Sequence, residues 1–387
     1  MKTVNVGIIG TGFMGKAHSN AWTDVNKFFD VGITPVRKVA CDSNGPAGSA
    51  LARRWGWEED CDSWQDTVAR KDVDIIDVCV PTWLHHDVVM AAVKNGKHVF
   101  CEKPVALNYA EAKEMYEAAE KAGVLHYLNH NYRRVPAVAF AKKMIEDGKI
   151  GTIYHWRGTY LQDWISDPNF PLTWHLQKKY AGAGPHYDLN SHSVDLARYL
   201  VGDIKEVSAM LKTFIPERPL PGKDAGTFKA GTGATAKGEV TVDDAAFMLA
   251  EFENGALGAF ETSRFANGRK NYNYFEIYGS KGSLAFNLER MNELQYLNLS
   301  DPADEQGFRT ILVTNATHPY VAAWWPPGHI IGYEHEFTHA VADFLTALEK
   351  GTKIEPNLCD GMKAMQVLEA GIISSRDGRK VAVSEVK

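Results

Sequence analysis

A glycine-rich turn near the start of the chain limits the possible folds more than any other feature. The segment Gly10-Thr11-Gly12-Phe13-Met14-Gly15 follows a β-rich run, Val4–Ile9, and opens an amphipathic stretch, Gly15–Val25. In such a strand–turn–helix unit the first glycine allows the tight turn, the second admits a pyrophosphate, and the third permits close packing. The helix N-terminus adds N–H groups and a positive dipole end. The pattern predicts a dinucleotide-binding turn made by Gly10, Gly12, Phe13, Met14 and Gly15.

The same alternation of apolar runs and amphipathic stretches continues to about residue 130. The expected strands are Val4–Ile9, Val36–Cys41, Val73–Val80, His98–Cys101 and Val124–Leu128. The expected helices are Gly15–Val25, Gly48–Trp55, Trp64–Arg70, His86–Asn95 and Tyr109–Ala122. Apolar strands alternating with helices of this length predict a parallel sheet covered on both faces. Right-handed crossovers then predict a doubly wound α/β domain of the Rossmann type over residues 1–130.

The remainder, residues 131–387, is expected to form an α+β domain with a large, mostly antiparallel open sheet. Strand-like runs separated by turns extend from Val207 to about Val313, and they follow an expected helix over Pro185–Val201. The stretch Leu220–Gly238 is rich in Gly, Lys and Thr, which predicts a mobile excursion. Two C-terminal helices, beginning near Glu334 and Asp360, can pack back on the first domain.

Charge and composition exclude several classes of protein. Lys and Arg number 42 against 48 Asp and Glu, a formal charge of −6, which argues against nucleic acid or anionic lipid as the main partner. The chain has no apolar run near 18 residues and no signal-peptide pattern. Its five cysteines are widely spaced without any CxxC, as is typical of reduced thiols in a cytoplasmic protein.

Asp42 ends the second expected strand, where a carboxylate can accept hydrogen bonds from both hydroxyls of a ribose. It lies 27 residues after Gly15 (42 minus 15), more than the usual spacing of about 20, and a loop over Phe28–Pro35 is expected to account for the excess. Ser43 and Asn44 follow, with no Arg or Lys to meet a 2′-phosphate, so the sequence favours NAD over NADP.

Two further segments carry side chains suited to proton transfer. Lys103 lies at the carboxyl end of a parallel strand, the edge where doubly wound sheets bind ligands. Beside a cationic nicotinamide its ammonium is disfavoured, so it can accept a proton, although most lysines are solvated surface charges. Asp188 and His192 follow a Gly184-Pro185 helix start at i and i+4, so both are expected on one helical face.

These motifs together resemble the Gfo/Idh/MocA oxidoreductase family over nearly the whole chain. The resemblance rests on GTGFMG, the Pro81-Thr82 turn with His85, the EKP of residues 102–104, and the Asp188/His192 pair. It implies a catalytic set of Lys103, Asp188 and His192, a commonly cis Lys–Pro peptide, and an open sheet that joins dimers or tetramers. It also implies that the bound NAD contacts Pro81, Thr82, His85, Glu102, Lys103 and Asn131.

A narrower resemblance is to members that use NAD to oxidise the 3-hydroxyl of an anhydro sugar. It rests on the segments FMGKAHS (13–19), NYRRVP (131–136), GTYLQDW (158–164) and IPERPL (215–220). It implies that Tyr132, Gln162 and Trp164 line the sugar pocket together with Lys103, Asp188 and His192. His175 replaces an Arg of those members, so the identity of the sugar stays open. Asn190 replaces the family's usual Gly, a change expected to affect how the helix approaches the substrate.

Three alternatives remain beside this hypothesis. The same catalytic set also suits an inositol, C1 of an aldose, or an anionic sugar such as a sulfosugar. A sensor that binds NAD without turnover is a second alternative, but it has no use for a proton relay. His335-Glu336-Phe337-Thr338-His339 matches the HExxH of zinc hydrolases, yet no third ligand stands at a convincing spacing, so no metal is predicted.

Overall fold

The computed structural model describes residues 2–222 and 236–387, and the chain divides into two compact units. The first unit takes the chain up to Ala106, then Ala110–Val135 and Thr314–Lys363. The second unit contains Leu107–Tyr109, Pro136–Val313 and Ala364–Lys387. Within the described residues, no helix combines the length and the apolar character needed to cross a membrane.

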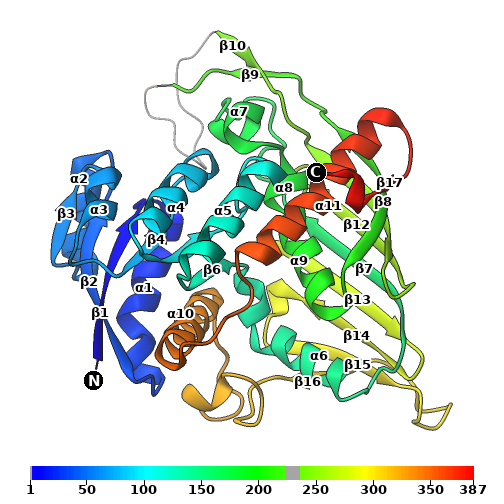
Figure 1. The fold of residues 1–387 in the computed structure, drawn as a ribbon. Helices are drawn as coiled ribbons and strands as arrows, with labels where there is room; N and C mark the ends of the chain where they lie inside the picture. Colours follow the sequence, from blue (N-terminus) through cyan, green and yellow to red (C-terminus); the bar gives the residue numbers. More distant parts are fainter. Residues whose placement is uncertain (1, 223–235) are drawn as a thin grey trace. The chain divides into compact units, whose positions relative to one another are not determined.

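The first unit contains a six-stranded parallel sheet with the order β3-β2-β1-β4-β5-β6, which confirms the predicted doubly wound fold (Figure 1). The strands are β1 (Lys2–Ile9), β2 (Ile33–Cys41), β3 (Glu59–Cys61), β4 (Ile75–Val78), β5 (His98–Glu102) and β6 (His126–Asn129). The helices between them are α1 (Phe13–Phe28), α2 (Gly45–Trp55), α3 (Trp64–Ala69), α4 (His85–Lys94) and α5 (Tyr109–Ala122).

Two details of this unit differ from the expectation. The strand β3 was not predicted, because its three residues are partly exposed and carry no apolar signal; it pairs with the outer edge of β2. The long spacing before Asp42 does not come from a loop over Phe28–Pro35. The helix α1 continues to Phe28 and β2 begins at Ile33, so the longer helix and strand account for most of the excess.

A late segment of the chain completes the core of the first unit. The helix α10 (Tyr333–Lys350) packs along α1 and buries Phe337, Phe344 and Leu345. The ring of Phe344 lies 6.5 Å from that of Trp22 on α1 and 5.4 Å from that of Phe100 on β5. Figure 1 shows α10, in orange, alongside α1, in blue. The first of the two expected C-terminal helices therefore packs within the first unit.

The second unit contains a nine-stranded sheet with the order β16-β15-β14-β13-β7-β12-β11-β8-β17. Its strands are β7 (Ile153–Leu161), β8 (Ile204–Lys212), β11 (Ala245–Phe252), β12 (Leu257–Ser263), β13 (Tyr272–Gly279), β14 (Gly282–Asn287), β15 (Glu293–Asn298), β16 (Arg309–Leu312) and β17 (Val381–Ala382). Only β7 and β12 run parallel within this sheet, so the predicted, mostly antiparallel sheet is confirmed. The short strands β9 (Glu217–Pro219) and β10 (Lys237–Glu239) form a separate pair.

One face of this sheet carries helices. The helix α9 (Asn190–Leu200) packs on β7 and β12, α8 (Pro185–Asp188) on β11 and β12, and α6 (Pro136–Glu146) on β14 and β15. The remaining helices are α7 (Lys178–Ala181) and α11 (Leu358–Asp377). The single helix expected over Pro185–Val201 is divided at Leu189 into α8 and α9. The predicted excursion over Leu220–Gly238 lies mostly outside the described residues.

Candidate active site

The glycine turn has the geometry that its sequence requires. Gly10 has a φ of +104°, and a Cβ there would overlap the backbone of Cys79 and Val80. A Cβ on Gly15 would overlap the carbonyl of Gly10, whereas one on Gly12 would meet open space. Gly12 caps α1 without any side chain that binds its first-turn N–H groups. The turn is therefore open where a phosphate needs to approach, and the residues present fit a dinucleotide.

Asp42 is oriented by the same turn. Its Oδ2 accepts the backbone N–H of Thr11 at 3.1 Å and the Thr11 hydroxyl, and its Oδ1 accepts the N–H of Asn44 at 2.9 Å. Phe13, also predicted to contact the cofactor, is exposed at the start of α1, and its ring stacks on Tyr333 at 6.2 Å. A carboxylate beside the phosphate turn is the acceptor that a ribose diol requires.

The loops that follow β4 and β5 are joined by His85. Its Nδ1 lies 2.9 Å from the carbonyl oxygen of Pro104, and its Nε2 lies 2.8 Å from that of Val80. The ring is buried, and burial lowers its pKa. The Lys103–Pro104 peptide is cis, as the resemblance implied. His85 therefore connects the Pro81-Thr82 turn to the segment that carries Lys103, and its contact with a cofactor stays a prediction.

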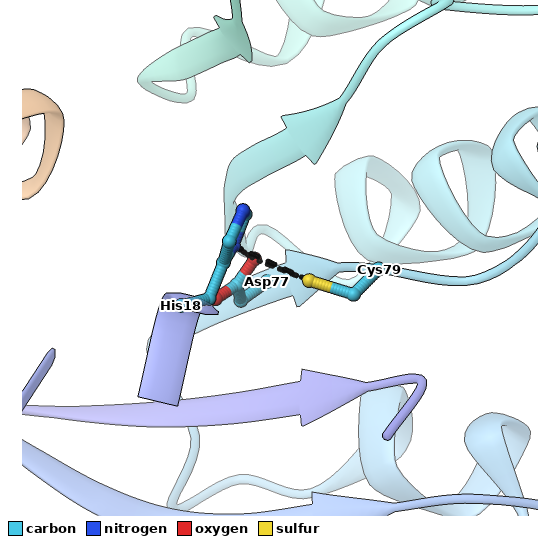
Figure 2. A group of neighbouring side chains, drawn as sticks. All are labelled: His18, Asp77 and Cys79. Carbon is cyan, nitrogen blue, oxygen red and sulfur yellow. Dashed lines mark hydrogen bonds and ion pairs between the residues drawn. The ribbon is translucent and has the colours of Figure 1, made fainter. Parts of the chain in front are cut away.

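A buried polar network lies beneath this strand edge (Figure 2). His18 on α1 places its Nδ1 2.8 Å from Oδ1 of Asp77 on β4 and its Nε2 2.8 Å from Oε1 of Glu102 on β5. Asn129, at the end of β6, donates to the same Glu102 oxygen at 2.6 Å. The second Glu102 oxygen accepts the backbone N–H of Lys103 at 3.2 Å. Four elements of the unit thus meet at one histidine.

The charges of this network follow from its hydrogen bonds. A neutral imidazole donates from one nitrogen only, so a ring that faces carboxylates on both sides is suited to the imidazolium form. Burial works to lower the pKa of His18, but its interactions with Asp77 and Cys79 together outweigh burial and raise that pKa well above 6.5. Burial also works to raise the pKa of Glu102, but the hydrogen bonds from His18 and Asn129 hold it below its usual value.

The side chains of His18, Asp77 and Cys79 are a combination that metal ions also use. Figure 2 shows the three side chains pointing toward one another. His18 Nδ1 lies 2.8 Å from the Asp77 oxygen and 3.2 Å from the Cys79 sulfur, which are hydrogen-bond distances. Ligands around a tetrahedral zinc stand farther apart, at about 3.3 Å or more, given Zn–N and Zn–O bonds of about 2.0 Å. The other Asp77 oxygen already accepts Trp22 Nε1 at 2.6 Å. The cluster is therefore a hydrogen-bonded network.

The HExxH segment has a structural explanation. His339 Nε2 accepts the indole N–H of Trp324 at 2.7 Å, and its Nδ1 lies 2.8 Å from the carbonyl oxygen of Arg134. Burial lowers the pKa of His339 to about 3. Glu336 is buried too, and its Oε1 accepts Asn131 Nδ2 at 2.7 Å. Both His339 nitrogens are engaged, so this helix face fixes Asn131 and the Arg134 backbone and offers no zinc site.

In the second unit, Asp188 ends a helix whose start is capped. The carboxylate of Asp243 accepts the N–H groups of Gly184 and His186 at 2.7 and 2.9 Å, which fixes the first turn of α8. Asp188 Oδ2 accepts Nη2 of Arg264 at 2.5 Å. Arg264 follows β12 directly and is almost completely buried. A buried arginine thus holds one of the predicted catalytic side chains.

The predicted sugar-binding residues of this unit form a connected set. The indole N–H of Trp164 donates to Gln162 at 2.8 Å, and the Gln162 amide donates to Asn271 at 3.0 Å. The ring of Trp164 meets His175 edge-on at 5.8 Å. Tyr160 donates to the same Asn271 oxygen at 2.6 Å, and its ring lies 5.8 Å from that of His192. Gln162, Trp164 and His175 are therefore neighbours, as expected for the wall of a pocket.

The predicted site residues are divided between the two units. The first unit contains Gly10, Gly12, Phe13, Met14, Gly15, Asp42, Pro81, Thr82, His85, Glu102, Lys103, Asn131 and Tyr132. The second unit contains Gln162, Trp164, His175, Asp188 and His192. The structure adds residues that the sequence analysis did not single out: His18, Asp77 and Asn129 in the first unit, and Tyr160, Arg264 and Asn271 in the second. His18 and Tyr160 lie inside the segments FMGKAHS and GTYLQDW, on which the narrower resemblance rests, and Asp77 had the signal of a carboxylate inside an apolar strand.

Comparisons with known proteins identify the family of this chain. Residues 4–130 match the family described as "Oxidoreductase family, NAD-binding Rossmann fold", and residues 138–285 match the "GFO/IDH/MocA C-terminal domain". The chain belongs to the Gfo/Idh/MocA family of oxidoreductases. It is 44% identical to levoglucosan dehydrogenase of Pseudarthrobacter phenanthrenivorans, with 100% of both chains covered.

Solved structures of family members have the same fold. The complex of levoglucosan dehydrogenase with NADH and levoglucosan has a TM-score of 0.93 at 42% identity, covering 98% of this chain and 99% of that one. An oxidoreductase domain protein from Kribbella flavida has a TM-score of 0.93 at 46% identity, covering 99% and 100%. The Gfo/Idh/MocA assignment therefore extends over the whole chain.

Proposed function

We propose that this Gfo/Idh/MocA protein is an NAD-dependent sugar dehydrogenase that oxidises a secondary hydroxyl of a pyranose-type, levoglucosan-like substrate at C3. The observation that carries the proposal is the full-length similarity to levoglucosan dehydrogenase, including its complex with NADH and levoglucosan. The connected set of Gln162, Trp164 and His175 supports a sugar pocket, because aromatic faces and amide groups suit a polyhydroxylated ring.

The proposed chemistry uses Lys103, His192 and Asp188. Gly10, Gly12 and Asp42 would hold NAD, which when bound would supply C4 of its nicotinamide as the acceptor for the hydride that the carbinol carbon loses on becoming a ketone carbon. Lys103 takes the proton of the same hydroxyl group, and His192 binds that oxygen and can share the proton. Asp188 orients the sugar by accepting hydrogen bonds from its hydroxyl groups. The kinetics of Lys103→Met and His192→Ala identify which of the two side chains is the general base.

The substrate is tested by NADH formation on a panel of sugars at fixed NAD. The expected result is the highest kcat/KM with levoglucosan and lower values with myo-inositol, glucose and a sulfosugar. His175 is the reason to keep the panel broad, since it stands where the related dehydrogenases have Arg. Activity on inositol or a sulfosugar with none on levoglucosan would replace the proposed substrate. NAD binding without turnover on any polyol would favour the sensor.

Replacing Asp42 with alanine is expected to raise the KM for NAD by about 10–100-fold, because hydrogen bonds to a charged acceptor contribute about 1.5–3 kcal/mol. The KM for the sugar is expected to stay unchanged. The variant is also expected to accept NADP better, since it lacks the carboxylate that repels a 2′-phosphate. Asp60→Ala is the matched control, because Asp60 is exposed and bonds to Ser49 on α2. Unchanged NAD and NADP kinetics in Asp42→Ala would contradict the assignment of the ribose acceptor.

We also propose that the protein is a homodimer or homotetramer joined through the sheet of the second unit. One face of this sheet exposes Met210, Phe247, Leu249 and Leu257, and Phe247 stands directly opposite Met210 in the pairing of β11 with β8. Exposed apolar side chains that lie next to one another on a sheet are suited to the association of two copies of this chain. Leu249→Glu is expected to yield monomers in sedimentation velocity, whereas Ile330→Glu, on an exposed loop of the first unit, leaves the assembly intact. Unchanged sedimentation of Leu249→Glu would argue against this interface.

The remaining proposals concern partners and location. A net charge of −6 supports a small sugar or polyol as the partner and speaks against nucleic acid or a membrane surface. The five cysteines, all within the described residues, form no disulfide with one another, which supports a reducing, cytoplasmic location.

A further inference from the structure

Arg264 is a charged side chain in the interior of the second unit. Its side chain is 1% exposed, whereas that of Asp188, to which it donates, is 33% exposed. Burying a guanidinium is costly unless its partners compensate for the lost water. The Asp188 carboxylate provides that compensation through a charge-assisted hydrogen bond of 2.5 Å from Nη2. The buried Arg264 therefore donates to Asp188, whose carboxylate is partly exposed.

The rest of the guanidinium contacts the predicted sugar wall. Its central carbon lies 5.0 Å from the centre of the Trp164 ring, within the range of a cation–π interaction. Nε and Nη1 are buried, and among the described residues neither has a hydrogen-bond partner. Arg264 therefore touches two side chains that were assigned to the substrate site independently, and it leaves two donors without a protein acceptor.

A second buried arginine of the same unit shows what a structural role looks like. Arg218 on β9 donates to the backbone carbonyls of Ile165 at 2.6 Å and Asp167 at 2.8 Å, and within residues 2–222 and 236–387 it forms no ion pair with a carboxylate. These hydrogen bonds hold the loop that contains Ile165 and Asp167 against β9. Both arginines lie over an aromatic ring, Arg218 over Phe265 at 5.8 Å and Arg264 over Trp164 at 5.0 Å. They differ in their hydrogen bonds, since that of Arg264 goes to the carboxylate of Asp188. Its partners are side chains of the candidate site, not the backbone of a loop.

We propose that Arg264 is a positioning residue that sets substrate specificity: it holds the Asp188 carboxylate as an acceptor for sugar hydroxyl groups and keeps the Trp164 ring beside it. This inference rests on the proposed function, because it assigns Asp188 and Trp164 to the binding of the sugar. Arg264 acts through these two residues, so its loss affects sugar binding more than the binding of NAD, whose predicted contacts lie in the first unit.

The test compares Arg264→Gln and Arg264→Lys with wild type on levoglucosan. Arg264→Gln is expected to raise the KM for the sugar by about 10–100-fold, with a smaller fall in kcat and an unchanged dissociation constant for NADH. The KM of Arg264→Lys for the sugar is expected to lie between those of the wild type and Arg264→Gln. Its ammonium keeps the charge beside Asp188 but lacks the planar face that covers Trp164. Arg290→Gln, an exposed arginine of the same unit, is the control that leaves the kinetics unchanged.

A double-mutant cycle separates positioning from a merely structural effect. If Arg264 acts mainly through Asp188, then Arg264→Gln adds little to the KM change in an Asp188→Asn background. Equal effects in both backgrounds, an unchanged KM, or a loss of NADH binding in parallel with sugar binding would overturn the inference. If Arg264→Gln does not fold, the same criteria apply to Arg264→Lys. If the wild type turns over a sugar and the Arg264 variants have the same kinetics as the wild type, only this inference is wrong. If the wild type is inactive on every polyol, the proposed function is wrong as well.

Discussion

Replacing Lys103 with methionine is expected to slow hydride transfer by about 10²–10⁴-fold, the usual contribution of a positioned general acid or base. Methionine keeps the length and apolar stem of the side chain but cannot accept a proton. Single-turnover NADH formation isolates this step from product release. The binding of NADH, measured by fluorescence titration, is expected to change little. Lys94→Met, an exposed lysine at the end of α4, is the control.

His192→Ala is expected to lower the same rate by a comparable factor, and the pair of variants identifies the base. If both side chains serve one proton transfer, the double variant is slowed little more than the slower single variant. The side chain whose replacement removes the pH dependence of kcat is the group that titrates. Near-normal single-turnover rates in both single variants would eliminate the proposed mechanism.

Replacing His18 with leucine is expected to lower the free energy of unfolding by about 3–5 kcal/mol, because removing one partner of a buried ion pair leaves a charge without compensation. Asp77 and Glu102 would then share a buried site without the imidazolium between them. Urea denaturation measures the change. His86→Leu is the matched control: its ring lies 3.0 Å from Glu114 near the surface, and such pairs contribute less than about 1 kcal/mol.

The difference in stability between wild type and His18→Leu is expected to narrow as the pH rises. Burial works to lower the pKa of His18, but Asp77 and Cys79 together raise it well above its unfolded value of 6.5. A group whose pKa is raised by folding contributes its full stability below the unfolded pKa and loses it as the pH climbs through the folded pKa. Denaturation at a series of pH values above about 6 follows this loss. A difference that is independent of pH would contradict the imidazolium form.

The parts of the first unit that were predictable are those whose chemistry is local. Each glycine of the turn has a backbone reason that the hexapeptide itself contains, and Asp42 lies at a strand end that hydrophobic pattern identifies. The network of His18 was not predictable in the same way, because its partner Asp77 is 59 residues away in the sequence. Asp77 within the apolar run Ile75–Val78 indicated that some partner exists, but only the fold shows which one.

In the second unit, too, local patterns were predictable and contacts between distant residues were not. Alternating apolar residues predicted β11, β12 and β13, since each of these strands has one face toward the core. The four residues of β16 and the two of β17 are edge strands that carry too little pattern to be recognised. The contact of Arg264 with Asp188 spans 76 positions, and no feature of the sequence around Arg264 distinguishes it from a surface arginine.

The position of α10 has a consequence for how the nascent chain matures. Its residues Phe337 and Phe344 complete a core with Trp22 and Phe100, more than 200 residues earlier in the chain. A ribosome therefore has to finish most of the polypeptide before the nucleotide-binding part can bury its own apolar surface. A fragment that stops at Val135 would leave that surface open to water and to other chains. Expression of this part by itself requires a fusion that restores Tyr333–Lys350 beside α1.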